Sequence, residues 1–235
     1  MRKLTILLSM LLLATGCSSV KTKNTTVFAD PSRKIAIVRI VAEKDSINHN
    51  GNKTGDFVLR EDFNVTAANM HLKIDKVARS QGANLVVVRN IGWNKKGSGF
   101  YAEGTLYHVS GTIPEPKEEP CALVFMRDHR EAYAVSSFPI SIAVNNRNYG
   151  EIKRDHSFMA GLKDCNEKAD VYINNEQQSI DLKGMTRYFS VLNASETMVL
   201  PAPGGLLVLY SRSKVNLVEI EDGLIGRLIY RQMEN

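Results

Sequence analysis

A short segment rich in proline and glutamate limits what this chain can fold into. Residues Ile113–Pro120 contain three prolines and three glutamates in eight positions. Proline has no N–H to donate and its φ is fixed, so such a segment neither pairs in a sheet nor continues a helix. We therefore predict an extended linker at 113–120 with one folded domain on each side.

The part before the linker, residues 33–112, contains one clear helical pattern. Its apolar positions recur at spacings of three and four residues, which places them on one helical face. They are Ala67, Met70, Ile74, Val77 and Ala78. Asn64 is suited to cap the start of this helix, and Gly82 is suited to end it in the left-handed conformation.

Three apolar runs around this helix have the length and composition of strands. They are Lys34–Val41, Ala83–Arg89 and Phe100–Val109. The asparagines and glycines between residues 48 and 55 indicate a loop after the first run. The glycine-rich stretch Gly92–Gly99 indicates a flexible loop between the last two. A small βαββ domain is the resulting prediction for residues 33–112.

The part after the linker, residues 121–235, reads as short strands separated by turn residues. We predict strands at Ala122–Met126, Ile140–Val144, Glu151–Arg154, Phe158–Leu162, Asp170–Ile173, Arg187–Leu192, Leu206–Tyr210 and Asn216–Ile220. Helical periodicity occurs only at Asp222–Met233. Regular strand spacing of this kind favours a β-sandwich. The predicted fold class is thus α+β, a βαββ domain followed by an immunoglobulin-like β-sandwich.

The N-terminus has the order of a signal peptide. Arg2 and Lys3 precede the apolar run Leu4–Ala14, and Thr15 and Gly16 follow it. The run has about eleven residues, whereas a helix needs roughly 20 to cross the hydrocarbon core of a bilayer. Residues 1–16 are therefore predicted to be a cleaved signal peptide and not a membrane anchor.

Small residues directly before Cys17 make this site similar to the lipobox of bacterial lipoproteins. The resemblance implies diacylglycerol and palmitate chains on Cys17 and a polar tether at 17–32. Ser18 stands where Asp marks inner-membrane retention in enteric-type lipoproteins, which implies the outer membrane with the folded part facing the periplasm. The alternative is an ordinary signal peptide with a chance cysteine.

Two cysteines remain in the second half of the chain, Cys121 and Cys165. In an oxidising periplasm they are the available intramolecular pair. A bridge would close a loop of about 45 residues and stabilise the fold by roughly 3 to 4 kcal/mol in the chain-entropy model. The alternative is a pair of buried free thiols.

Two segments resemble known lipoprotein families. Residues 78–84, Ala-Arg-Ser-Gln-Gly-Ala-Asn, followed by Leu85–Val88, a glycine-rich loop and Gly104–Tyr107, are similar to a family of small, uncharacterised envelope lipoproteins. That family is similar to the core of the outer-membrane sensor lipoprotein of the Rcs envelope-stress phosphorelay. The resemblance covers residues 33–110 and implies the βαββ architecture. Ala122–Arg127 and Ile142–Ile152 resemble an immunoglobulin-like domain found in bacterial lipoproteins.

No pattern of catalytic, metal-binding or cofactor-binding residues emerges from the sequence. The histidines lack the helical spacing that places two zinc ligands on one face; they are His49, His71, His108, His129 and His156. No nucleophile elbow, phosphate loop or dinucleotide fingerprint occurs. The formal net charge is +5, of which Arg2 and Lys3 in the signal contribute two, so nucleic acid is not indicated as a partner. We predict no enzyme, no metal and no cofactor.

Two local features remain as candidates for interaction. Trp93 near Lys95 and Lys96 favours a loop tip that contacts a partner or anionic lipid, and the alternative is a tryptophan folded onto the core. The tripeptide Arg-Asp-His occurs at 127–129 and at 154–156. It indicates either a charged, pH-responsive cluster or two solvated turns.

The sequence-based expectation is a non-catalytic, membrane-anchored envelope lipoprotein that binds another envelope component. Its oligomeric state is left open. One alternative is an envelope stress or redox sensor that uses Cys121 and Cys165. Another is a hydrolase whose site converges only in the folded chain.

Overall fold

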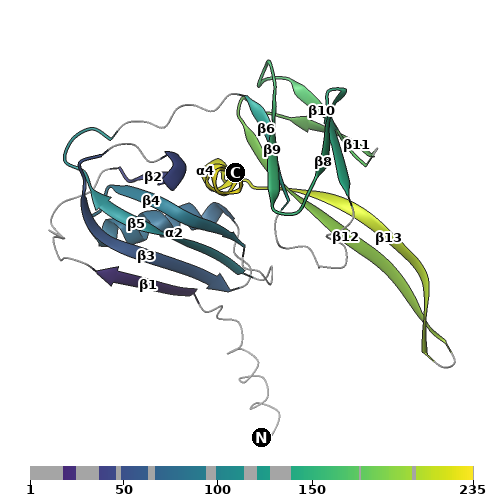
Figure 1. The fold of residues 1–235 in the computed structure, drawn as a ribbon, viewed down its shortest axis with the longest axis horizontal. Coiled ribbons are helices and arrows are strands. Elements are labelled where there is room, and N and C mark those ends of the chain that lie inside the picture. The colour runs from purple at the N-terminus through teal and green to yellow at the C-terminus, as the bar shows by residue number, and fades with distance from the viewer. Residues whose placement is uncertain are drawn as a thin grey trace, which may run out of the picture.

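A computed structural model describes residues 18–24, 37–45, 49–62, 67–93, 99–113, 121–127, 139–174, 176–202 and 205–234. Within these ranges no helix has both the length and the hydropathy that crossing a membrane requires. The chain forms one five-stranded sheet covered by helices and, beside it, two four-stranded sheets (Figure 1).

The first sheet has the strand order β1-β3-β5-β4-β2. Its strands are β1 (Ser18–Asn24), β2 (Arg39–Ala42), β3 (Asn52–Asp62), β4 (Leu85–Trp93) and β5 (Gly99–His108). Only β2 and β4 pair in parallel; the other neighbours are antiparallel. A short 3-10 helix, η1 (Glu43–Asp45), follows β2.

The helix that the apolar spacing predicts is present as α2 (Ala67–Ser80). Met70, Ile74, Val77 and Ala78 are buried in the core between this helix and the sheet. Gly82 has a φ of 67°, which is the left-handed conformation expected after the helix end. Asn64, the expected cap, lies outside the described residues.

The predicted α+β class is wrong, because strands dominate the chain. The described residues form thirteen strands in three sheets and two α-helices. In the first sheet, β3 occupies part of the segment that we expect to be a loop, and β1 occupies part of the expected tether. β3 pairs with β1 and β5 along its length and buries Phe57 and Leu59 on one face, so cross-strand bonds and burial outweigh its weak local strand signal.

The second half contains the two four-stranded sheets, in the orders β11-β10-β7-β8 and β13-β12-β6-β9. The strands are β6 (Ala122–Arg127), β7 (Ile140–Val144), β8 (Arg147–Ile152), β9 (His156–Gly161), β10 (Lys168–Ile173), β11 (Glu176–Asp181), β12 (Arg187–Ala202) and β13 (Gly205–Glu219). Side chains from both sheets share one apolar core. The pairing of β6 with β12 is parallel, which departs from the all-antiparallel immunoglobulin-like sandwich that we expect.

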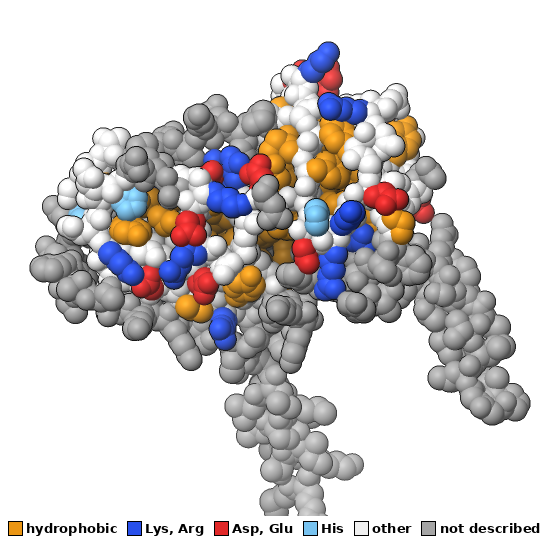
Figure 2. Space-filling model, viewed as in Figure 1, with side chains coloured by type: hydrophobic (Ala, Val, Ile, Leu, Met, Phe, Trp, Pro, Cys, Tyr) orange, Lys and Arg blue, Asp and Glu red, His pale blue; other side chains and the backbone are white. Residues whose placement is uncertain are grey.

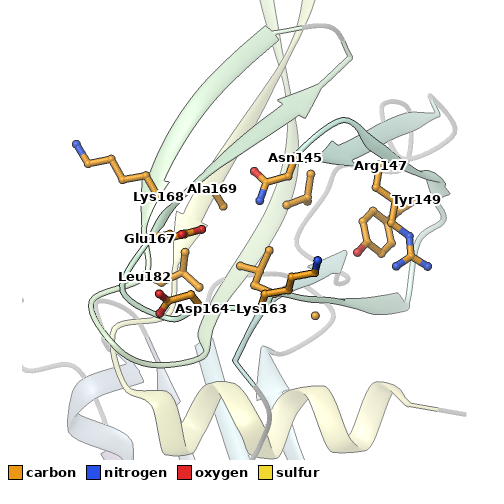
Figure 3. A pocket seen from close by; sticks show the side chains of 12 residues that line it. Asn145, Arg147, Tyr149, Lys163, Asp164, Glu167, Lys168, Ala169 and Leu182 are labelled. Atoms are coloured by element: carbon orange, nitrogen blue, oxygen red, sulfur yellow. The ribbon is translucent and has the colours of Figure 1, made fainter.

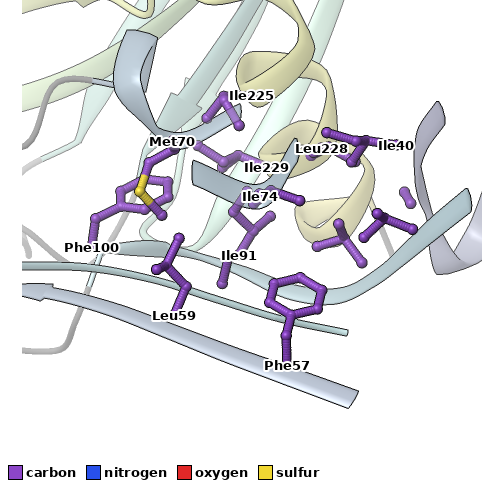
Figure 4. Close-up of a cluster of buried hydrophobic side chains, with 14 of the residues drawn as sticks. Ile40, Phe57, Leu59, Met70, Ile74, Ile91, Phe100, Ile225, Leu228 and Ile229 are labelled. Atoms are coloured by element: carbon purple, nitrogen blue, oxygen red, sulfur yellow. The ribbon is translucent and has the colours of Figure 1, made fainter. Parts of the chain in front are cut away.

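The C-terminal helix α4 (Gly223–Met233) returns to the first sheet. Ile225, Leu228 and Ile229 point from α4 into the core between the sheet and α2 (Figure 4). The same core contains Val124 and Met126 from β6. The helix predicted at Asp222–Met233 is therefore present, and it joins the two halves of the chain through one apolar cluster.

Polar contacts hold α4 at both ends. Asp222 caps the N-terminus by accepting from the backbone N–H of Leu224 and Ile225 at 3.1 and 3.2 Å, and its carboxylate also contacts His71 of α2. Near the C-terminus, Gln232 accepts from the backbone N–H of Ile91 at 2.6 Å and donates to Asn90 at 2.6 Å. These contacts fix both the position and the direction of the helix.

Charged groups add to this attachment. Arg227 and Arg231 lie 3.4 and 3.3 Å from the carboxylate of Asp45 in η1. Arg231 also donates to Glu234 at 2.7 Å, and this hydrogen bond lowers the pKa of Glu234 below its usual value. A negative residue in η1 and two arginines on α4 thus select the orientation in which the helix docks.

Gly226 of α4 allows the close approach of Tyr188 from β12. A Cβ at position 226 would lie 2.5 Å from Cγ and 2.6 Å from Cβ of Tyr188, which are the near atoms of that side chain. In an open helix Gly→Ala gains up to about 1 kcal/mol. Here we expect Gly226→Ala to destabilise by roughly 1 to 3 kcal/mol through overpacking.

The matched control for this prediction is Gly223→Ala, because Gly223 lies in the same helix and a Cβ there meets no atom within 4 Å. Urea unfolding of the two variants gives the comparison. A midpoint for Gly226→Ala at or above that of Gly223→Ala would contradict the packing described for Tyr188.

Candidate functional site

A shallow hollow of about 250 Å³ lies at one end of the second half of the chain (Figure 3). It is formed where the β7–β8 turn, the β9–β10 connection and the residue after β11 come together. Its lining consists of Val144, Asn145, Arg147, Tyr149, Gly161, Leu162, Lys163, Asp164, Glu167, Lys168, Ala169 and Leu182. These positions are far apart in sequence and meet only in the folded chain.

The floor of the hollow is apolar. Val144, Ala169 and Leu182 are buried. Alternation along β7 and β10 turns every second side chain toward the core, and Val144 and Ala169 occupy such positions at the strand ends. The floor is therefore an exposed corner of the same core that holds the two sheets together.

The rim of the hollow is charged and exposed. Arg147, Lys163 and Lys168 supply three positive charges. Asp164 and Glu167 supply two negative charges, and they lie across the hollow from Arg147 in Figure 3. A ligand for this rim would carry charge of both signs around an apolar group.

Tyr149 connects the rim with the core through a row of aromatic rings. The guanidinium of Arg147 lies 5.1 Å from the ring centroid of Tyr149, and that ring stacks on Phe158 with 5.2 Å between centroids. The row continues to Phe125 at 5.2 Å and Phe189 at 5.9 Å. Because each ring is packed against the next, the Arg147 side of the rim has a rigid support.

The β7–β8 turn orients this rim. Asn145 and Asn146 have φ values of 46° and 63°, as a two-residue type I′ turn requires. The side chain of Asn145 accepts from the backbone N–H of Asp170 at 2.9 Å, so the turn is fixed to β10. Asparagine tolerates positive φ better than most residues, which explains this choice.

The opposite rim is held by a disulfide. Cys121 and Cys165 are bonded with their Cα atoms 5.4 Å apart, as the sequence predicts. The backbone N–H of Leu162 donates to the carbonyl of Cys121 at 2.8 Å, and that of Gly184 donates to the carbonyl of Cys165 at 2.9 Å. The bridge thus fixes the connection that carries Lys163 and Asp164.

Of the predicted lipidation site and interaction loop, Trp93 is described, whereas Cys17, Lys95 and Lys96 lie outside the described residues. Trp93 is half-buried, makes an edge contact with Phe100 at 5.2 Å between centroids, and packs against the first core. This geometry favours the alternative in which the tryptophan folds back on the core.

The repeated Arg-Asp-His tripeptides meet in the structure through Arg127 and His156, which pair across β6 and β9. Arg127 is 1 % exposed and donates to the carbonyl of Ile152 at 2.9 Å. Its own carbonyl accepts from the backbone N–H of Asp155 at 2.7 Å. Asp128 and His129 lie outside the described residues. The described contacts close a turn and do not form a site.

The size and lining of the hollow limit the chemistry that it can support. Its volume is below the roughly 300–1,000 Å³ of small-molecule sites, and its lining has no serine, histidine or free thiol. No group of three or more His, Cys, Asp or Glu side chains that could hold a metal occurs among the described residues. An apolar floor within a charged rim is also the arrangement found in many protein–protein interfaces.

The visible face of the described residues does not carry charge of a single sign. Figure 2 shows lysine and arginine side chains interspersed with aspartate and glutamate on the visible face of the described residues. The hollow itself was missed by the sequence reasoning. Its one local signal is the Asn145–Asn146 turn, because the other lining residues are brought together by strand pairing and the disulfide.

Comparisons of the chain with protein-family models, with curated proteins and with solved structures found no match.

Proposed function

We propose that this protein is a non-catalytic envelope lipoprotein that is moored to the outer membrane through Cys17, faces the periplasm and binds another envelope protein at the hollow. The observation that supports this is the apolar floor of Val144, Ala169 and Leu182 within a rim of exposed charges. The partner would insert one apolar side chain, with charged neighbours above the rim.

The rim charges provide the test. A photo-reactive amino acid at Lys163 is expected to give a discrete cross-linked adduct in intact cells. Replacing Arg147 and Lys168 with Glu reverses two rim charges, and this is expected to lower the adduct yield roughly tenfold, which corresponds to about 1.4 kcal/mol.

The matched control is Arg60→Glu with Lys76→Glu, the same change of charge on exposed positions of the first sheet and α2. This control should leave the adduct unchanged. Equal yields from the rim variant and the control, at equal protein levels, would remove the hollow as the docking site.

A second function, stress or redox sensing, is supported by one observation. The Cys121–Cys165 bridge holds the connection that carries Lys163 and Asp164, so reduction would release one side of the hollow. A sensor of this kind would bind its partner in only one redox state. Replacing both cysteines with Ser would then change envelope-stress signalling at normal protein levels, and an unchanged response would exclude it.

A further inference from the structure

Strands β12 and β13 continue far beyond the sheet to which they belong. β12 pairs with β6 only through Arg187–Ser190, whereas its pairing with β13 extends from Phe189 to Ala202. Among the described strands, the outer part of this hairpin is therefore a two-stranded ribbon. Figure 1 shows it running away from the rest of the molecule.

The sequence of the ribbon divides it into a polar stem and an apolar tip. The stem pairs residues 194–197 with 211–214, including Ser195 opposite Ser213 and Glu196 opposite Arg212. The tip consists of Met198–Ala202 and Gly205–Tyr210, and these eleven positions carry no charge. The hydrophobic residues are thus concentrated at the end that is farthest from both cores.

The register of the tip places apolar residue types at positions on both faces. Successive residues of a strand alternate between faces, so Val199 and Leu200 lie on opposite faces, as do Leu207 and Val208 that pair with them. A strand that packs on a core needs only one apolar face. Apolar residues on both faces of an extended ribbon indicate that a separate apolar phase surrounds the tip.

The charges and aromatic residue next to the tip fit a lipid surface. Going from tip to stem, β13 reads Tyr210, Arg212 and Lys214 at alternate positions. An aromatic ring at the edge of an apolar segment, followed by cations, is the usual order at a bilayer interface with anionic headgroups. Glu196 lies opposite Arg212 in the register and leaves Lys214 as a net positive charge of the stem.

The position of the ribbon agrees with contact between its tip and a lipid bilayer. The free end of the hairpin and strand β1 lie on the same side of the molecule in Figure 1, and β1 begins at Ser18, directly after the proposed lipid-bearing residue. One membrane surface along that side would meet both.

The length of the tip limits how deep it goes. Five to six residues at about 3.3 Å each extend less than about 20 Å, and a membrane-crossing strand needs roughly 9–11 residues. The open edges of a two-stranded ribbon also carry backbone groups that hydrocarbon cannot satisfy. Pro201 has no N–H, so this position adds no unsatisfied donor. The tip is thus suited to one leaflet.

We propose that the tip of the β12–β13 hairpin inserts into the interfacial region of the bilayer and forms a second membrane contact. This inference rests on the proposed function, in which the lipid on Cys17 holds the chain at a membrane. The lipid on Cys17 and the tip would together fix the orientation of the molecule, with the hollow held at a set distance from the membrane.

The experiment uses the full mature chain with Cys17→Ser, exported behind a signal peptide that is cleaved without lipidation. Binding to vesicles of phosphatidylethanolamine and phosphatidylglycerol then measures the contribution of the tip without that of the lipid on Cys17. In a Trp93→Phe background, Leu200→Trp is expected to shift its emission to the blue and to be quenched by brominated lipid. Ser195→Trp in the stem is the matched control and should show neither effect.

A second pair of variants tests the energetics. Leu200→Asp with Leu207→Asp is expected to reduce vesicle binding at least roughly tenfold, because two carboxylates oppose both insertion and the anionic surface. Ser195→Asp with Ser213→Asp in the stem should reduce it much less. Urea unfolding should be the same for both double variants and the parent chain, since these tip and stem positions pair beyond the part of β12 that joins β6.

Three results would overturn the proposal. They are vesicle binding that the tip aspartates do not change, equal quenching of the tip and stem tryptophans, and tip-dependent self-association without lipid binding. The lipid-free chain makes the test independent of the mooring. If Cys17→Ser leaves cell fractionation unchanged, the proposed mooring is wrong, and vesicle binding by the tip remains a separate result. If the tip aspartates leave vesicle binding unchanged, tip insertion is wrong, and the mooring through Cys17 is unaffected.

Discussion

Leu228→Ala is expected to lower the free energy of unfolding by roughly 2–5 kcal/mol, the usual range for removing a buried leucine side chain. Leu228 is 2 % exposed in the core between α4, α2 and the first sheet. The polar contacts of Asp222 and Gln232 hold α4 at both ends, so the helix cannot move far to refill the space. The cavity would therefore remain largely open, and the effect should lie in the upper part of this range.

The control is Leu72→Ala, the same change at a helical leucine of α2 that is 58 % exposed. Surface substitutions of this kind alter stability by about 0.5 kcal/mol or less. Chemical denaturation followed by circular dichroism measures both variants. Similar losses for Leu228→Ala and Leu72→Ala would show that α4 is not docked on the first sheet.

The effect should reach beyond the first sheet, because the core around Leu228 includes residues of the second half. Val124 and Met126 of β6 and Tyr188 of β12 belong to the same cluster. Removing the leucine weakens an apolar cluster that links the two halves among the described residues. We expect the wild type to unfold in a single transition, and we expect this transition to broaden or separate in the variant.

The position of α4 illustrates what the sequence could predict and what it could not. Periodicity identifies a helix at Asp222–Met233 and the apolar residues that face a core. It carries no information on which core, because the first sheet lies more than a hundred residues earlier in the chain. The partners Asp45 and Asn90 have no local feature that links them to α4.

The hairpin shows a different limit. Sequence patterns predict Leu206–Tyr210 and Asn216–Ile220 as separate strands, because the residues between them are mostly polar. In the structure these segments are one strand, since the polar residues between them pair with the polar stem of β12. Local propensity underestimates strands whose polar positions are satisfied by a partner strand.

The disulfide was predictable from the number of cysteines and the expected compartment, whereas its position next to the hollow was not. Lys163 and Asp164 owe their place to Cys165, which bonds to a residue 44 positions away. Spacing alone predicts a pair of cysteines, whereas the surface that the bond supports depends on the β9–β10 connection.

Replacing Cys121 and Cys165 with Ser is expected to cost roughly 3–4 kcal/mol of stability, because the unfolded chain regains the entropy of a loop of about 45 residues. Urea unfolding measures the loss. Treating the wild type with a phosphine reductant should reproduce it, and the same reductant should leave the double variant unchanged. An unaltered midpoint in the double variant would show that the bridge contributes nothing to the fold.

The same variant separates a binding role of the hollow from a purely structural role of the disulfide. Release of Cys165 frees the connection that carries Lys163, while the Asn145 turn on the opposite rim keeps its bonds to β10. Adduct formation from Lys163 should therefore fall at urea concentrations far below unfolding. Vesicle binding by the hairpin tip should persist, because β12 and β13 are joined by their own register. If adduct formation and vesicle binding were lost together, the bridge would stabilise the whole second half of the chain. The hollow would then have no separate sensitivity to redox state.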